Sequence, residues 1–172
     1  AVLWLSCSHR DMDENLALME NDTLQNPVKN PVKYLALGDS YTIGESVDED
    51  QRFPVQLVKM LNDDGIKTMP AKIIARTGWT TNDLLESIKN SDDLGTFDLV
   101  TLLIGVNNQY QGRDTAEYRI QFRELLKTAI RFAKNNEKKV IVISIPDYGV
   151  TPFAQNKDTA KIDDNNERNL LI

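Results

Sequence analysis

The 172-residue sequence contains few of the residues that several classes of site require. It has one cysteine, Cys7, so a disulfide within the chain is excluded. Its one histidine is His9, and no cluster of histidine and cysteine has the spacing of a metal site. No G-x-G-x-x-G or P-loop motif is present to bind a nucleotide. We therefore expect neither a metal nor an organic cofactor.

Long apolar runs and an excess of basic charge are also missing. No run approaches the roughly 20 residues of a membrane-spanning helix. The net charge of -6 and the pI near 4.8 argue against a nucleic-acid partner. A content of 41% hydrophobic and 27% charged residues is that of an ordinary globular chain. The length suits one domain with a hydrophobic core and is short for two.

The first eight residues, Ala-Val-Leu-Trp-Leu-Ser-Cys-Ser, resemble the end of a bacterial lipoprotein signal peptide. Such a peptide ends at a lipidated cysteine, which would be Cys7. This interpretation attaches the protein to a membrane and places it in the cell envelope or outside the cell. The alternative is a disordered apolar N-terminus with a free thiol, in which case the protein is cytoplasmic.

The residues that follow are polar and acidic, and Pro27 and Pro31 interrupt any regular element. This composition predicts a tether rather than a packed segment. We therefore expect two parts, a signal-peptide remnant with a polar tether over residues 1–32 and a folded domain over residues 33–172.

Within the domain, apolar strand patterns alternate with helical patterns. The expected strands are Tyr34–Leu37, Ala71–Ala75, Asp98–Ile104 and Lys139–Pro146, and the expected helices are Phe53–Leu61, a segment that holds Leu84, Leu85 and Ile88 after a cap at Thr80 or Thr81, about Thr115–Asn135, and a last one that begins within Asp158–Ile172. Strands this apolar, separated by helices, are typical of a parallel sheet covered on both faces. We predict an α/β fold, a three-layer α/β/α sandwich with a flavodoxin-like, doubly wound sheet.

The first expected strand runs directly into Gly38, Asp39 and Ser40. Reactive groups of an open α/β sheet lie at the C-terminal ends of its strands. Gly38 would permit a sharp turn, Asp39 would accept hydrogen bonds from nearby amides, and Ser40 would begin the next helical segment. Thr42 replaces the second glycine of the G-x-S-x-G elbow, so this is not the α/β-hydrolase motif. The alternative is an ordinary turn.

Two further strand ends carry residues that could stabilise an oxyanion. Gly78 follows the second strand and offers a backbone N–H without a side chain in the way. Asn107 follows the third strand, after Gly105, and offers a side-chain amide. With the N–H of Ser40 these groups supply three donors, as acyl transfer from a serine requires. The alternatives are a plain turn at Gly78 and a helix cap or turn at Asn107.

Three stretches, Gly38–Ser40, Gly78 and Gly105–Asn107, resemble sequence blocks one, two and three of the SGNH (GDSL-type) hydrolases. The resemblance is in their order, their spacing and their positions after strands. The resemblance covers residues 33 to about 158. It implies a three-layer fold with strand order 2-1-3-4-5 and ester hydrolysis through an acyl-enzyme. The roles that it implies are Ser40 as nucleophile, Ser40, Gly78 and Asn107 as oxyanion hole, and Gly38, Asp39 and Gly105 as supporting residues.

The fourth block of this family, Asp-x-x-His, does not occur in the sequence. It supplies the histidine that acts as general base, and a serine without a base is a poor nucleophile at neutral pH. His9 precedes the domain and is not expected to replace it. A fifth strand is also missing, which would leave the apolar fourth strand at a sheet edge. We therefore expect the printed sequence to be incomplete at its C-terminus.

The sequence predicts a serine esterase that acts on an ester of a glycan, a lipid or a small molecule. Tyr110, Arg113 and Trp79 are weaker candidates for substrate contact. One alternative is a catalytically inactive protein that binds an acylated ligand. Another is a flavodoxin-like domain that binds a phosphorylated ligand at Ser40, which would leave Gly78 and Asn107 unexplained.

Overall fold

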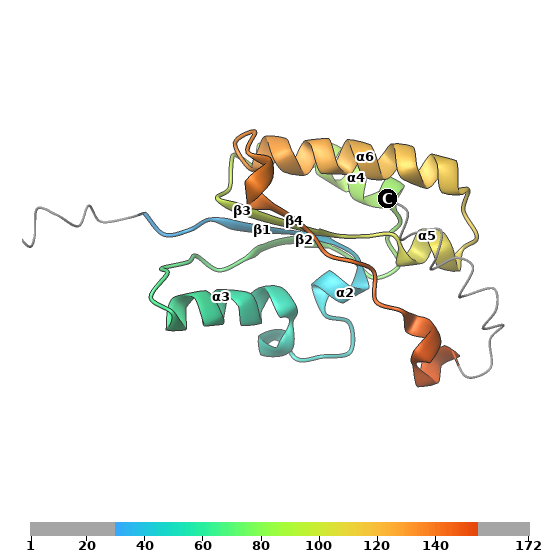
Figure 1. The fold of residues 1–172 in the computed structure, drawn as a ribbon, viewed down its shortest axis with the longest axis horizontal. Helices are drawn as coiled ribbons and strands as arrows, with labels where there is room; N and C mark the ends of the chain where they lie inside the picture. The colour runs from blue at the N-terminus through green and yellow to red at the C-terminus, as the bar shows by residue number, and fades with distance from the viewer. Residues whose placement is uncertain (1–29, 155–172) are drawn as a thin grey trace, which may run out of the picture. The chain divides into compact units, whose positions relative to one another are not determined.

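A computed structural model describes residues 30–154, and the structural statements below concern this part of the chain. Its centre is a parallel sheet with the strand order β2-β1-β3-β4 (Figure 1). The strands are β1 (Tyr34–Gly38), β2 (Lys72–Ala75), β3 (Leu99–Leu103) and β4 (Val140–Val142). The predicted parallel α/β sheet is confirmed, and its order matches the first four strands of the expected topology.

Strand β1 lies at the centre of the sheet, and all five of its residues are buried. It pairs with β2 on one side and β3 on the other, and Gly38 is level with Ala75 and with Leu103. The three strands therefore end at the same height. The loops that follow them start side by side along one edge of the sheet.

Helices cover both faces of the sheet, so the predicted three layers are present. Figure 1 shows α4 and α6 on one face and α3 on the other. The helices are α2 (Ser40–Ile43), α3 (Phe53–Asp63), α4 (Thr81–Lys89), α5 (Val106–Tyr110) and α6 (Thr115–Phe132), and the 3-10 turns are η1 (Glu49–Gln51), η2 (Glu137–Lys139), η3 (Tyr148–Val150) and η4 (Pro152–Ala154).

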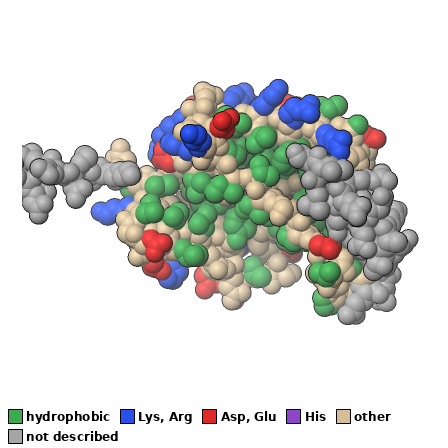
Figure 2. Space-filling model, viewed as in Figure 1, with side chains coloured by type: hydrophobic (Ala, Val, Ile, Leu, Met, Phe, Trp, Pro, Cys, Tyr) green, Lys and Arg blue, Asp and Glu red, His purple; other side chains and the backbone are tan. Residues whose placement is uncertain are grey.

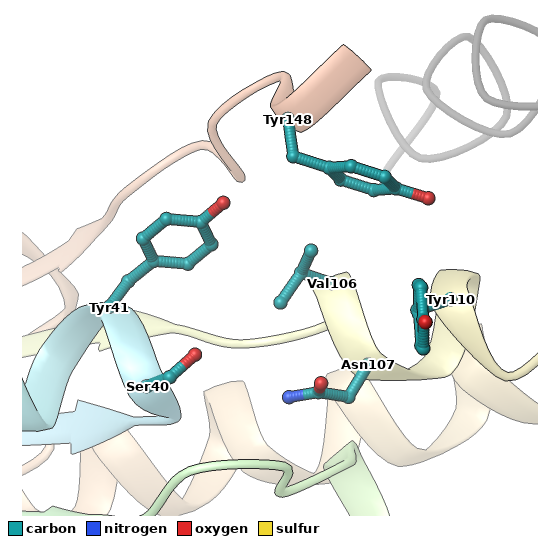
Figure 3. A pocket seen from close by; sticks show the side chains of 6 residues that line it. All are labelled: Ser40, Tyr41, Val106, Asn107, Tyr110 and Tyr148. Carbon is teal, nitrogen blue, oxygen red and sulfur yellow. The ribbon is translucent and has the colours of Figure 1, made fainter. Parts of the chain in front are cut away.

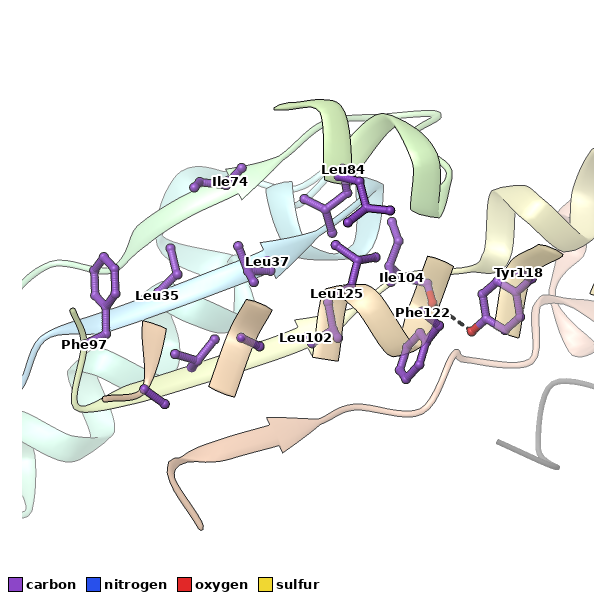
Figure 4. Close-up of a cluster of buried hydrophobic side chains, with 14 residues drawn as sticks. Leu35, Leu37, Ile74, Leu84, Phe97, Leu102, Ile104, Tyr118, Phe122 and Leu125 are labelled. Carbon is purple, nitrogen blue, oxygen red and sulfur yellow. Dashed lines mark hydrogen bonds between the residues drawn. The ribbon is translucent and has the colours of Figure 1, made fainter. Parts of the chain in front are cut away.

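The main hydrophobic core fills the layer between the sheet and the pair α4 and α6 (Figure 4). Leu35 and Leu102 enter it from the sheet, and Leu84 and Leu125 enter it from the two helices; all four are fully buried. Burial of one such side chain stabilises the fold by about 1.5–3 kcal/mol. The core thus fixes the sheet against the two helices that begin near its C-terminal edge.

Helix α6 ends at Phe132, three residues earlier than the apolar pattern predicts. Lys134 and Asn135 have φ angles of 59° and 57°, which a right-handed helix does not allow. The carboxylate of Asp98, just before β3, binds the ammonium of Lys134 at 2.7 Å. The chain therefore turns here instead of continuing the helix.

Strand β4 is shorter than predicted. The last ladder hydrogen bond runs from the Ile143 N–H to the Leu102 carbonyl at 3.0 Å, after which the chain leaves β3. Pro146 would interrupt a longer ladder, since it has no N–H. Ile141 and Val142 are about half exposed, at 49% and 48%, and Figure 2 shows hydrophobic side chains gathered where β4 lies in Figure 1.

Several expectations fall outside the described residues. These are the lipidated Cys7, the position of His9, the tether before residue 30 and the helix expected within Asp158–Ile172. The domain boundary after residue 32 also stays a prediction. Over residues 30–154, no helix combines the length and the apolar content that crossing a bilayer would take.

The core assignment predicts a difference between two residues of α6. Leu125→Ala should lower the free energy of unfolding by about 2–5 kcal/mol, because it opens a cavity beneath the sheet. Ile120→Ala is the matched control, since Ile120 is 64% exposed, and it should change the value by less than about 0.5 kcal/mol. Denaturant unfolding measures both, and equal losses would contradict the assignment.

Candidate active site

Ser40 is the first residue of α2 and follows β1 after a single residue, Asp39. The Asp39 carboxylate caps this short helix, because its Oδ1 accepts a hydrogen bond from the Tyr41 N–H at 3.1 Å. The predicted role of Asp39 in holding the turn is thus observed. Ser40 itself is half-buried, so its hydroxyl can reach a ligand.

The turn before Ser40 leaves no space for a side chain at Gly38. A Cβ atom there would lie 2.0 Å from Thr42 Oγ1 and 2.5 Å from the Leu103 carbonyl oxygen. Both distances are far below van der Waals contact, and one involves the backbone. Gly38 is therefore required by close packing of α2 on the sheet, whereas the sequence predicted a need for unusual backbone angles.

Gly78 lies in the exposed loop between β2 and α4, and here the backbone angle does require glycine, with φ at +84°. The loop is held from both sides. The Thr77 hydroxyl donates to the Glu45 carboxylate. Thr80 forms a capping box with Asp83 at the start of α4, with the Thr80 N–H bound to Asp83 Oδ2 at 2.8 Å. Thr80, and not Thr81, is the cap.

Asn107 lies in the first turn of α5, directly after β3 and Gly105. Its Nδ2 donates to the carbonyl oxygen of Trp79 at 2.9 Å, which orients the amide. An amide nitrogen carries two hydrogens, and this bond uses one of them. The second can be donated to a ligand. Gly105 is itself tightly packed, because a Cβ there would lie 2.7 Å from the Tyr118 hydroxyl.

A cavity of about 230 Å³ lies at this edge of the sheet (Figure 3). Ser40 and Asn107 both line it, and in Figure 3 the amide nitrogen of Asn107 lies on the side of Ser40. The remaining lining side chains are Tyr41, Val106, Tyr110 and Tyr148. The structure thus brings together the predicted nucleophile and one predicted oxyanion donor.

The other predicted site residues lie elsewhere. Gly78 is not among the described residues that line the cavity, and it connects to Asn107 through the carbonyl of the next residue, Trp79. Trp79 packs against the main core. Of the two weaker candidates after Asn107, Tyr110 lines the cavity, whereas the Arg113 side chain binds Gln111 Oε1 at 3.2 Å.

Two aromatic walls of the cavity were not predicted. Tyr41 is adjacent to Ser40, and that adjacency was a usable signal. Tyr148 lies beyond β4 on η3, where the same rule of strand ends would have suggested it. The rings of Tyr110 and Tyr148 meet edge to face, with centroids 6.4 Å apart. This arrangement is a favourable one for aromatic pairs.

The electrostatics of the site centre on Asp39. Its carboxyl is fully buried, and this burial raises its pKa to about 6, although the backbone amides of Tyr41 and Gly105 oppose the shift. Burial, with the charge of Asp39, also raises the pKa of Tyr41. The Tyr41 phenol therefore stays protonated at neutral pH and can donate a hydrogen bond at the cavity.

Comparison with known proteins gives consistent results. The GDSL-like Lipase/Acylhydrolase family matches residues 36–170. The fold is similar to that of AlinE4, an SGNH-hydrolase family esterase, with 23% identity, a TM-score of 0.57, and 81% of this chain and 70% of that chain covered. No match is found among curated proteins.

Two further solved structures share the fold. An acetyl xylan esterase, AlAXEase, is 17% identical with a TM-score of 0.61, over 81% of this chain and 71% of that one. The esterase EstA from Pseudoalteromonas sp., in a structure inhibited by monoethylphosphonate, is 15% identical with a TM-score of 0.55, over 80% and 73%.

The raised pKa of Asp39 predicts a pH dependence of stability. The folded state holds the Asp39 proton up to pH of about 6 and the unfolded chain only up to about 3.8. The contribution of Asp39 to the free energy of unfolding is therefore most favourable below about pH 4. It decreases by about 3 kcal/mol as the pH rises through 6. Asp39→Asn removes this titration.

The measurement is urea unfolding of the wild type and of Asp39→Asn at pH 4 and pH 7. The wild type should lose stability relative to the variant between the two values. Parallel behaviour of the two proteins would show that Asp39 titrates normally.

Proposed function

Because this chain belongs to the GDSL-like lipase/acylhydrolase family, we propose that it is a serine esterase that hydrolyses carboxylic esters through an acyl-enzyme on Ser40. The observation that carries the proposal is that the Ser40 hydroxyl and the Asn107 amide line one cavity at the C-terminal edge of the sheet. A nucleophile and an oxyanion donor on one cavity are two of the groups that acyl transfer from a serine requires, the third being a general base.

In the proposed reaction, Ser40 Oγ attacks the ester carbonyl carbon and its proton passes to a general base. The negative charge on the carbonyl oxygen is stabilised by the N–H groups of Ser40 and Gly78 and by Asn107 Nδ2. Collapse of the intermediate breaks the bond to the alcohol, which leaves with the proton. Water then attacks the acyl-enzyme and releases the acid, and Ser40 recovers its proton.

The general base has no assigned residue in the part that the structure describes. The family resemblance implies a histidine from an Asp-x-x-His block, and the one histidine of the printed sequence is His9. We assign no step to His9. The residues that can be assigned are those that attack and those that stabilise the oxyanion.

The cavity suits the apolar part of an ester. Tyr41, Tyr110 and Tyr148 present aromatic rings, and Val106 adds an aliphatic surface. A cavity of about 150 Å³ is enough for benzene, so 230 Å³ accommodates a ring-sized group or a short acyl chain. We propose that such a group, from a glycan, lipid or small-molecule ester, occupies it. Membrane attachment through a lipidated Cys7 is proposed on the sequence alone.

The nucleophile assignment predicts a single covalent adduct. The protein expressed from its source gene is treated with an alkyl phosphonate that reacts with activated serines, and its intact mass is measured. One adduct should form on the wild type and none on Ser40→Ala. Ser46→Ala is the control, because Ser46 is exposed and close in sequence, and it should keep the adduct. An unlabelled wild type would contradict the esterase and favour a binding protein.

The oxyanion assignment predicts a change in kcat rather than KM. Asn107→Ala removes a donor that acts on the transition state, so kcat should fall about 10²- to 10³-fold while KM changes little. Asn82→Ala, at an exposed position of α4, should leave both constants unchanged. Hydrolysis of p-nitrophenyl acetate measures them. A rise in KM with kcat intact would assign Asn107 to ground-state binding instead.

A further inference from the structure

The loops that carry Gly78 and Asn107 come from strands that are not neighbours. Strand β1 lies between β2 and β3, so each loop is positioned by its own strand. The hydrogen bonds of the sheet fix the starts of the loops but not the separation of residues three or four positions further on. Contacts between the loops themselves must set that separation.

A buried pair, Asn108 and Thr81, supplies such a contact. Asn108 Oδ1 accepts from the Thr81 N–H at 3.0 Å, and Asn108 Nδ2 donates to Thr81 Oγ1 at 2.7 Å. Thr81 is fully buried and Asn108 is 6% exposed. Because both polar atoms of the amide are bound to one residue, the amide has a single satisfied orientation.

The pair is supported from a third element. Thr81 Oγ1 donates to Gln121 Oε1 of α6 at 2.5 Å, and Gln121 Nε2 donates to Glu117 Oε1 at 2.7 Å. Thr81 thus accepts from Asn108 and donates to Gln121 with one hydroxyl. The start of α4 is thereby fixed to α5 and to α6 by polar side chains that are hydrogen-bonded to one another.

The neighbouring residue adds a second attachment. Asn107 Nδ2 binds the Trp79 carbonyl, so two consecutive asparagines hold the segment after Gly78 at residues 79 and 81. Two attachment points prevent the segment from pivoting about either one. The Gly78 amide, directly before the first point, is then held relative to the Asn107 amide.

We infer that Asn108 and Thr81 are positioning residues of the oxyanion hole, which fix the distance between the Gly78 and Asn107 donors. The catalytic part of this inference rests on the proposed esterase function, whereas the attachment of the loops does not. Oxyanion donors act only when they are correctly placed, and a displacement of about 1 Å can cost about a hundredfold in rate. Neither residue needs to touch the substrate.

The test compares three substitutions. Thr81→Val keeps the shape of the side chain but removes the hydroxyl, and Thr81→Ser restores it. Thr101→Val is the matched control, because Thr101 is also buried and its hydroxyl also has a buried partner, Tyr34 Oη at 2.8 Å. That pair lies within the sheet, away from the two loops.

Two measurements are made on each variant. Backbone hydrogen exchange over residues 77–81 and 105–108, with acrylamide quenching of Trp79 in a Trp4→Phe background, reports the attachment of the loops. The values of kcat and KM with p-nitrophenyl acetate report catalysis. Denaturant unfolding separates local loosening from global loss of stability.

Thr81→Val should speed exchange in the two loops and raise Trp79 quenching, and kcat should fall about ten- to a hundredfold with KM within about twofold. Thr81→Ser should return all values to those of the wild type. Thr101→Val should lower stability but leave both the loops and kcat unchanged. A Thr81→Val protein with wild-type loops, or a Thr101→Val protein with an equal loss of kcat, would overturn the inference.

If Thr81→Val does not fold, Thr81→Ala takes its place, since it also removes the hydroxyl, keeps the Thr81 N–H bond to Asn108 Oδ1 and places no methyl group where Oγ1 binds the amides of Asn108 and Gln121. The outcomes given for Thr81→Val then support or overturn the inference in the same way. If the wild type neither hydrolyses the ester nor takes up the phosphonate, the proposed function fails, and the exchange and quenching data alone decide whether the pair holds the loops together.

Discussion

The site depends above all on three parallel strands that end at one height. Gly38 is level with Ala75 and with Leu103, so the chain leaves the sheet at neighbouring points three times. Because β1 is buried along its whole length, the packing of helices on both faces fixes its end. Ser40 lies two residues beyond that end, so the same packing sets its position. The proposed nucleophile is thus placed by a fully buried central strand and not by a long loop.

Much of this arrangement could be predicted from the sequence, and for a physical reason. A strand covered on both faces must be apolar throughout, so β1 and β3 are visible as continuous apolar runs. Once they are parallel, their C-terminal ends must meet, and the residues after them, Ser40 and Asn107, must lie on one edge. That both residues lie at one site could therefore be predicted without knowledge of side-chain packing.

The parts that could not be predicted depend on geometry that leaves no local pattern. The apolar run at the fourth strand gives no sign that pairing with β3 stops at Ile143, because apolar residues continue to Ile145. The contact between Thr81 and Asn108 joins residues 27 positions apart, and it depends on the direction in which α4 leaves its loop.

The fold constrains the residues that form the walls of the cavity less than it constrains the candidate catalytic residues. Gly38 admits no side chain, and Asn107 and Asn108 are each bound to a fixed partner, so change there is penalised by the fold itself. Tyr110, by contrast, is 56% exposed and lies at the end of a short helix, where substitutions cost the fold little. Under the proposed function, the range of accepted esters can therefore change through substitutions at such positions while Ser40 and Asn107 stay the same. Selection for a new substrate would act first on the aromatic rim.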